Sequence, residues 1–306
     1  MNKKGFEFSF AWIFAIIVGA VVLFLAIYAA SSFINTSRFE TDTKIGAQLG
    51  IILNPVETNL EESKYVTINF PDETRVFNNC RNDGNFGRQG ISTAVRSDFG
   101  KEFGKPGVEI NYFNKYVFSD KVEEGKKLHV FVKSFDMPYK VADLIIISSE
   151  NYCFVSPPDE IYDEIADLNM DNVEIVFSVE DCRIGIKSVC FISGECDINV
   201  NHEMKFVVKD GRSVYYEDDL VFGAIFADTE IYECQVQRLM KRSGELAHVY
   251  AAKTEFLSSN GCSSNLRDDL IRFGNMQIED SSELRKKADF ADDLGGRNDL
   301  LSCKLF

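Results

Sequence analysis

The sequence has few of the residues from which catalytic and metal sites are usually built. Histidine occurs three times, at His129, His202 and His248, and these positions lie far apart along the chain. The eight cysteines include no closely spaced Cys-x2–4-Cys pair of the kind that structural zinc sites prefer. Gly-x-Ser-x-Gly, the Gly-x4-Gly-Lys-Ser/Thr phosphate loop, His-Glu-x2-His and Gly-x-Gly-x2-Gly are also absent. The sequence therefore predicts no cofactor and no metal, and it names no catalytic residue.

Basic residues are in deficit as well. The chain has 33 Lys and Arg against 48 Asp and Glu, a net charge of −15. An acidic surface repels nucleic acid and anionic lipid head groups, so we expect neither as a partner. The glycine-rich stretch 83–90 lacks the phosphate-loop lysine and is expected to be a surface turn. The paired acids at 218/219, 268/269 and 292/293 lack EF-hand spacing and are expected to be solvated.

What the sequence does contain is a long uncharged run near its start. No charged side chain occurs from Phe8 to Ile34, shortly after Lys3 and Lys4. At ~1.5 Å of rise per residue, a helix over this run is roughly 40 Å long, enough to cross a ~30 Å hydrocarbon core. The basic flank favours a cytoplasmic N-terminus and an extracytoplasmic chain from about Asn35 onward. Cleavage near Ala29–Ser31 is the alternative, but the run exceeds the ~7–15 apolar residues of a secretory signal.

All cysteines follow this run, and their number is even. In an oxidising exterior this pattern favours up to four disulfides. Cys190 and Cys196 are expected to pair, because the segment between them reads as a hairpin turning near residues 193 and 194. Cys234, Cys262 and Cys303 are expected to cross-link the C-terminal region, and the other pairings stay open. The candidate disulfide cysteines are Cys80, Cys153, Cys182, Cys190, Cys196, Cys234, Cys262 and Cys303.

Periodicity divides the chain into four parts. Residues 1–34 hold the short cytoplasmic N-terminus and the transmembrane helix. Residues 35–63 are predicted to form an amphipathic helical stalk with a kink at Asn54-Pro55. Residues 64–227 form a β-rich extracytoplasmic domain, and residues 228–306 form a helical region. The predicted fold class is α+β.

Strands dominate the third part, and we expect mainly antiparallel pairing. Hairpins are predicted at Asp210-Gly211, which suits a tight primed turn, and near Ser149–Asn151. A helix is predicted after the cap-like sequence Ser156–Asp159. The predicted strands are Tyr65–Phe70, Ile91–Arg96, Val108–Phe113, Leu128–Phe135, Ala142–Ser148, Tyr152–Val155, Val173–Val179, Arg183–Ile192, Lys205–Lys209, Val214–Tyr216 and Leu220–Phe226.

The C-terminal region changes to helical spacing. A long helix is predicted from Asp228 or Thr229 to a C-cap at Asn260-Gly261. Shorter helices are predicted at Leu266–Phe273 and Glu283–Leu294, the second ending at a Gly295-Gly296 break.

The extreme N-terminus resembles a known family. Lys3-Lys4-Gly5-Phe6, followed directly by a long apolar helix, is similar to the class III leader of type IV pilin-like proteins. The resemblance implies cleavage between Gly5 and Phe6 and packing of the mature helix in a filament core. That family usually has glutamate at the fifth mature position, where this sequence has Phe10. An uncleaved signal anchor remains the other interpretation.

The sequence thus predicts a single-pass cell-membrane protein with a structural or interaction role at the envelope, including that of a minor pilin-like subunit. Its expected partners are membrane lipid, through the N-terminal helix, and proteins at the envelope or in a filament. The alternative is an anchored envelope hydrolase whose site is assembled from residues distant in sequence, and the sequence does not decide whether the chain is an enzyme.

Overall fold

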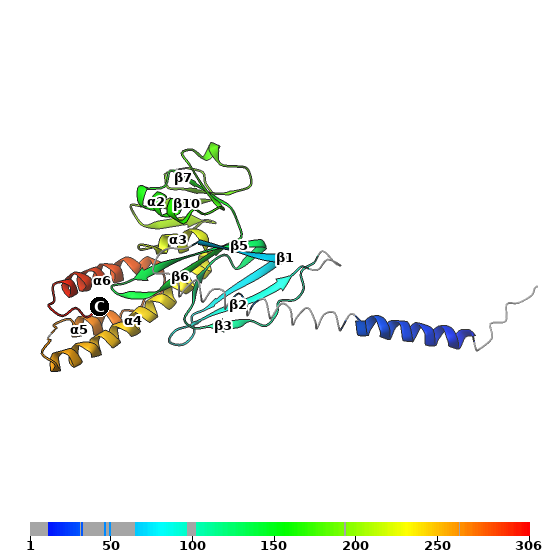
Figure 1. Ribbon diagram of the computed structural model, residues 1–306, viewed down its shortest axis with the longest axis horizontal. Coiled ribbons are helices and arrows are strands. Elements are labelled where there is room, and N and C mark those ends of the chain that lie inside the picture. The colour runs from blue at the N-terminus through cyan, green and yellow to red at the C-terminus, as the bar shows by residue number, and fades with distance from the viewer. Residues whose placement is uncertain are drawn as a thin grey trace, which may run out of the picture.

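The computed structural model describes residues 12–30, 32, 46, 49, 65–96, 102–192, 194–262 and 264–306. These residues form an N-terminal helix, two six-stranded sheets and a group of C-terminal helices, which confirms the α+β class (Figure 1). The predicted kink at Asn54-Pro55 and the proposed cleavage site at Gly5 and Phe6 lie outside the described residues.

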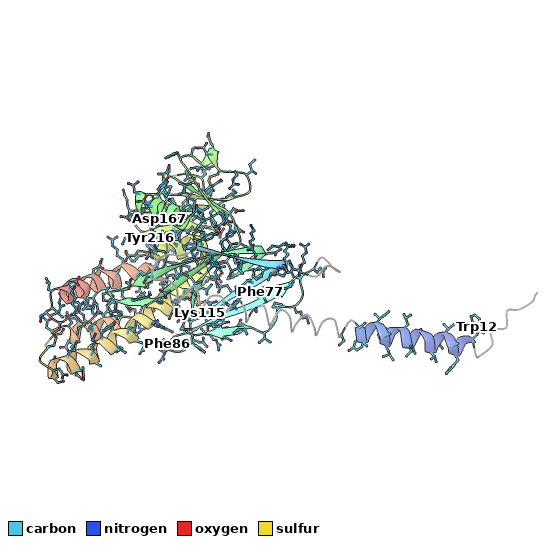
Figure 2. The ribbon with its side chains drawn as sticks, viewed as in Figure 1. Trp12, Phe77, Phe86, Lys115, Asp167 and Tyr216 are labelled. Carbon is cyan, nitrogen blue, oxygen red and sulfur yellow. A yellow bond between two sulfur atoms is a disulfide. The ribbon has the colours of Figure 1, made fainter. Side chains whose placement is uncertain are left out.

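The N-terminal helix spans Trp12–Ala30 and has a mean hydropathy of 2.8. At ~1.5 Å per residue it is about 28 Å long, close to the thickness of a bilayer core. Within the described part of the chain it is the one helix long and apolar enough to cross a membrane. The rest of the protein buries none of it, and in Figure 2 Trp12 and its neighbours extend away from the body.

The first sheet has the strand order β3-β2-β1-β5-β6-β4. Its neighbours pair antiparallel, apart from β4 and β6, which run parallel. The strands are β1 Tyr65–Arg81, β2 Arg88–Val95, β3 Ile110–Tyr112, β4 Tyr116–Phe118, β5 Val122–Asp136 and β6 Lys140–Ser148.

Strand β1 is much longer than predicted. The prediction ended it before Pro71, because proline cannot donate to a sheet ladder. Instead, the pairing of β1 with β5 shifts register between Asn69 and Thr74, and the strand then continues to Arg81. The irregularity places the proline where no ladder hydrogen bond is needed.

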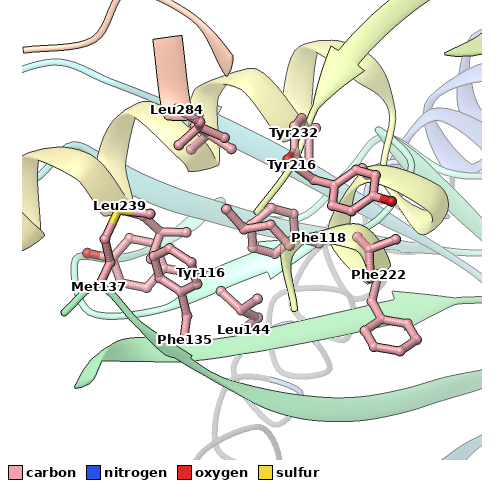
Figure 3. Close-up of a cluster of buried hydrophobic side chains, with 14 of the residues drawn as sticks. Tyr116, Phe118, Phe135, Met137, Leu144, Tyr216, Phe222, Tyr232, Leu239 and Leu284 are labelled. Carbon is pink, nitrogen blue, oxygen red and sulfur yellow. The ribbon is translucent and has the colours of Figure 1, made fainter. Parts of the chain in front are cut away.

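Both faces of the first sheet are apolar and buried. On β5, Val130 and Val132 point to one face, while Phe131 and Phe135 point to the other. Leu49, from the predicted stalk, is 1% exposed and packs on the Val130 face. The Phe131 face packs under the helices and forms the main core, part of which is shown in Figure 3.

The second sheet has the order β12-β11-β10-β9-β7-β8 and is mixed. Strands β8, β7, β9 and β10 run parallel, and β10, β11 and β12 pair antiparallel, so the expectation of mainly antiparallel pairing is not confirmed here. Helix α2, Asp159–Leu168, joins β7 to β8, because parallel neighbours need a crossover connection. The strands are β7 Tyr152–Val155, β8 Val173–Val176, β9 Lys187–Cys190, β10 Ile198–Asn201, β11 Phe206–Lys209 and β12 Arg212–Tyr215.

One of the three predicted hairpins is confirmed. The turn between β11 and β12 has Asp210 at φ 50° and Gly211 at φ 69°, the positive angles that a primed turn requires. The hairpin predicted near Ser149–Asn151 is wrong, because β6 and β7 belong to different sheets. This segment is the connection between the two sheets.

The helices correct two further predictions. Leu220–Phe226 was predicted as a strand but is helix α3, with all seven residues buried. A short run that is apolar throughout does not distinguish a buried strand from a buried helix. Helix α6, Leu284–Asp299, continues through Gly295 and Gly296 because the buried Leu294 and Asn298 hold it on both sides of the predicted break.

The remaining helices agree with the sequence. Helix α4 spans Thr229–Ser259, with Asp228 accepting a hydrogen bond from the Glu230 amide at its start. It ends at Asn260, followed by Gly261 at φ 85°. Helix α5 spans Arg267–Gly274, and short 3-10 turns occur at η1 Val179–Asp181 and η2 Ser281–Glu283.

All eight cysteines are paired. The Cys190–Cys196 pair is confirmed, although β9 and β10 on either side of it are parallel and therefore do not form the predicted hairpin. Cys262–Cys303 cross-links the helical region, whereas Cys234 on α4 reaches back to Cys80 on β1. The four disulfides are Cys80–Cys234, Cys153–Cys182, Cys190–Cys196 and Cys262–Cys303.

Candidate functional site

A polar cavity of about 450 Å³ lies where the two sheets meet. Strand β5 contributes Lys127 and His129, the connection after β6 contributes Ser149, and Asp171 comes from the segment before β8. Positive and negative side chains therefore converge on one space. The residues lining the cavity are Gly125, Lys126, Lys127, His129, Ser149, Asn151 and Asp171.

His129 is the centre of this cavity's hydrogen-bond network. Its Nδ1 lies 2.6 Å from the Tyr65 hydroxyl and 3.1 Å from Asp171 Oδ1. The Tyr65 hydroxyl donates to Asp171 and accepts from Thr67 Oγ1 at 3.0 Å. Tyr65 opens β1, so the cluster joins the start of the body to both sheets.

The network favours one tautomer of the imidazole. Burial lowers the pKa of His129, and the neighbouring Lys127 lowers it further, so the ring is neutral at pH 7. Since the proton of Tyr65 is used on Asp171, we assign the ring proton to Nδ1, where it is donated to the Tyr65 oxygen. This assignment leaves Nε2 unprotonated and able to act as a base.

Ser149 is not available to that base. Its hydroxyl lies 2.7 Å from Glu123 Oε2, and its amide donates to the same oxygen at 2.7 Å. Glu123 also accepts the Asp120 amide at 3.0 Å and is 2% exposed. Burial raises the pKa of Glu123 to about 7, with the charge of Asp120 adding to the effect. Among the described residues the cavity thus supplies an acid–base histidine oriented by a carboxylate, without an adjacent activated nucleophile.

A pH dependence of stability follows from Glu123. Between pH 4.5 and 7 the folded state holds a proton on Glu123 that the unfolded state has lost, so the free energy of unfolding falls as pH rises through this window. The shift corresponds to about 3 kcal/mol. We expect Glu123→Gln to remove this slope when urea unfolding of the full-length protein in detergent is compared at pH 5 and pH 7.5. Glu124→Gln, at a half-exposed side chain paired with Arg75, is the control; an unchanged slope in Glu123→Gln would contradict the assignment.

Two cations of the second sheet contact other parts of the body. Lys187 on β9 contacts Asp120 at 3.0 Å and Glu150 at 2.9 Å, both from connections of the first sheet. Lys209 on β11 is 7% exposed and donates to the carbonyls of Ile225 and Ala227 at the end of α3. Burial lowers the pKa of Lys209 to about 8. These contacts hold the second sheet in position, and both ammonium groups are already used in them.

The histidines remain separate in the fold. His202 contacts the Tyr216 hydroxyl at 3.3 Å, and His248 lies beside Gly274 between α4 and α5. The described residues contain no group of three His, Cys, Asp or Glu side chains that could hold a metal ion. The expectation of a surface turn over 83–90 holds only for its first part: residues 83–86 are exposed, Gly87 is buried against Arg238, and Arg88–Gly90 begin strand β2.

The cavity was missed in the sequence. The sequence shows His129 only as an isolated histidine, because Tyr65 and Asp171, the partners that define its environment, lie 64 and 42 positions away. Only the fold brings the other two side chains to it.

Comparison of this chain with protein-family models, with curated proteins and with solved structures finds no match. Function is therefore argued from the molecule alone.

Proposed function

We propose that this chain is a single-pass membrane-anchored protein whose body acts outside the cytoplasm as a structural or interaction subunit of the cell envelope. The observation that carries the proposal is the helix Trp12–Ala30, which is long and apolar enough to cross a membrane and is not buried inside the rest of the protein. Such a surface is stable in water only if lipid or other apolar helices cover it. The four disulfides support a body in an oxidising compartment.

The finer proposal is a pilin-like subunit cleaved between Gly5 and Phe6. It is supported by Leu49, which lies 19 positions beyond the apolar helix and packs on the apolar face of the first sheet. An apolar anchor helix with a nearby residue held on the body suits a subunit that stands on the membrane. Phe10 stands where the family usually has glutamate, so the sequence departs from the family pattern there. Cleavage between Gly5 and Phe6 therefore needs a direct test.

The test is intact and N-terminal peptide mass spectrometry of membrane-extracted native protein, with and without reduction. We expect a chain that begins at Phe6 and eight cysteines that become alkylated only after reduction. A chain that retains Gly5 would refute processing and leave an uncleaved anchor. Eight alkylated cysteines without reduction would overturn the extracytoplasmic location.

A second candidate function, an anchored hydrolase, is favoured by the pairing of His129 with Asp171 in the cavity between the sheets. Its reaction would use the imidazole as a general base toward water, with Lys126 and Lys127 attracting an anionic substrate. Turnover of phosphate-ester or carboxylate-ester substrates that His129→Gln abolishes would establish this function.

A further inference from the structure

The outer face of the second sheet is only partly covered. The segments 177–186, 191–192 and 194–196 pack over β7, β8 and β9, where Val179, Cys182 and Cys196 contact the buried Cys153 and Cys190. Two disulfides fix these segments in place. Over β10 and β11 the described residues leave a groove of about 520 Å³. It is bounded by Phe191, Ile192, Gly194, Asn199, Asn201, His202, Glu203, Phe206 and Val208.

The walls of the groove and the surface beside it are apolar and exposed. Ile192 is 55% exposed and Met204 62% exposed. Further along the same covering segments, Phe177 and Ile184 are almost completely exposed. The segments that carry Phe177, Ile184 and Ile192 are each tied to the sheet by a disulfide. Exposed apolar groups around a groove are typical of surfaces that bind another protein.

Two asparagine side chains on the floor of the groove each have one hydrogen-bonding atom that is not used by the described residues. Asn199 donates from Nδ2 to the Cys196 carbonyl at 3.0 Å, which leaves its Oδ1 as an acceptor. Asn201 accepts the Met204 amide on Oδ1 at 2.9 Å, which leaves its Nδ2 as a donor. The two residues are two positions apart on β10, so their side chains share a face about 7 Å apart. This spacing matches the two-residue repeat of an extended peptide.

The surface around the groove is acidic. Glu203 lines the groove and Glu195 follows the lining residue Gly194; both are exposed and form no ion pair with the described part of the chain. The nearby cations are already neutralised, Arg183 by Glu174 at 2.6 Å and Lys205 by Glu217. A second copy of this chain, with a net charge of −15, would be repelled here, as would an anionic lipid surface. The complementary partner is cationic.

We infer that this groove binds an extended segment of a partner protein in which apolar side chains alternate with Lys or Arg. The backbone of the segment pairs with Asn199 Oδ1 and Asn201 Nδ2, its apolar side chains enter between Ile192 and Val208, and its cations face the acidic rim. This mode of recognition combines backbone hydrogen bonds with pockets for alternate side chains. The inference rests on the interaction role proposed above and names the chemistry of the partner.

The test uses full-length, oxidised protein in detergent and three fluorescein-labelled octapeptides, with binding followed by fluorescence anisotropy. In the first peptide Val alternates with Lys, in the second Val alternates with Glu, and in the third Ser alternates with Lys. We expect the Val/Lys peptide to bind at least tenfold more tightly than either of the others. Equal binding of the Ser/Lys peptide would mean that the groove recognises charge alone and would overturn the inference. No binding of the Val/Lys peptide would also overturn it.

Two variants separate hydrogen bonding from charge. Asn201→Asp keeps the acceptor for the Met204 amide but removes the donor and adds a negative charge. We expect it to weaken Val/Lys binding about tenfold, whereas a purely electrostatic site would bind more tightly. Ile192→Ser should weaken binding similarly, and Phe256→Ser, at an exposed position on α4, is the matched control. Wild-type affinity in both groove variants would refute the site. If the peptide does not bind but the chain is anchored with its body outside the cytoplasm, the inference about the groove falls and the proposed function stands.

Discussion

Replacing Cys80 and Cys234 together with alanine is expected to lower the free energy of unfolding by about 5 kcal/mol. This disulfide joins β1 to α4 across 154 positions, the longest separation among the four pairs. In the chain-entropy description, a cross-link stabilises by restricting the unfolded chain, and the effect grows with the logarithm of the enclosed loop. The measurement is denaturant unfolding of the oxidised full-length protein followed by near-ultraviolet circular dichroism.

The matched control is the double alanine variant of Cys190 and Cys196, which are six positions apart. The same relation gives about 2 kcal/mol for that short loop. The ratio of the two effects tests the explanation, because both variants remove one disulfide from the same protein. Equal losses would show that the Cys80–Cys234 bond does not act through the unfolded chain.

Arg238 is expected to be the most sensitive charged side chain of the helical region. It is 0% exposed on α4, lies over the Tyr116 ring at 4.7 Å, and donates to the carbonyls of Phe86 and Phe113 at 3.1 and 3.2 Å. It also donates to Gln235 Oε1 at 2.7 Å. Each of these partners is neutral, and burial lowers the pKa of Arg238 to about 10.

Arg238→Ala is therefore expected to cost about 3–5 kcal/mol, because it leaves a cavity and removes the donors of buried carbonyls. Those carbonyls belong to the turns before β2 and β4, so these two turns should loosen first. Hydrogen exchange at these turns and urea unfolding measure the two effects. Arg212→Ala, at a 60% exposed side chain, should cost less than about 1 kcal/mol. A similar loss in both variants would contradict the structural role of Arg238.

Local patterns were enough to predict several elements. Helix α4 has a cap at Asp228, a regular apolar stripe and Gly261 after its end, all within one stretch of chain. The Asp210-Gly211 turn likewise depends on two adjacent residues. Predictions failed where the outcome depends on distant packing. The apolar run Leu220–Phe226 became a helix because it is surrounded by core on all sides.

Sheet topology and the candidate site were beyond local patterns for the same reason. Strands β7, β8 and β9 satisfy their backbone groups equally well in parallel or antiparallel pairs, so their short apolar sequences do not encode direction. Strand β10 was missed because Asn199 and Asn201 alternate with its two buried residues and give a weak strand pattern. The Tyr65–His129–Asp171 cluster exists only once the two sheets are joined.

The Cys80–Cys234 bond also determines how the protein carries mechanical load. Residues between these cysteines, which include the entire second sheet, form a closed covalent loop. Tension applied between the N-terminal helix and the chain beyond Cys234 passes through the sulfur–sulfur bond and bypasses this loop. Because the groove on the second sheet lies inside this loop, pulling on the two ends of the body leaves the backbone around the groove unloaded.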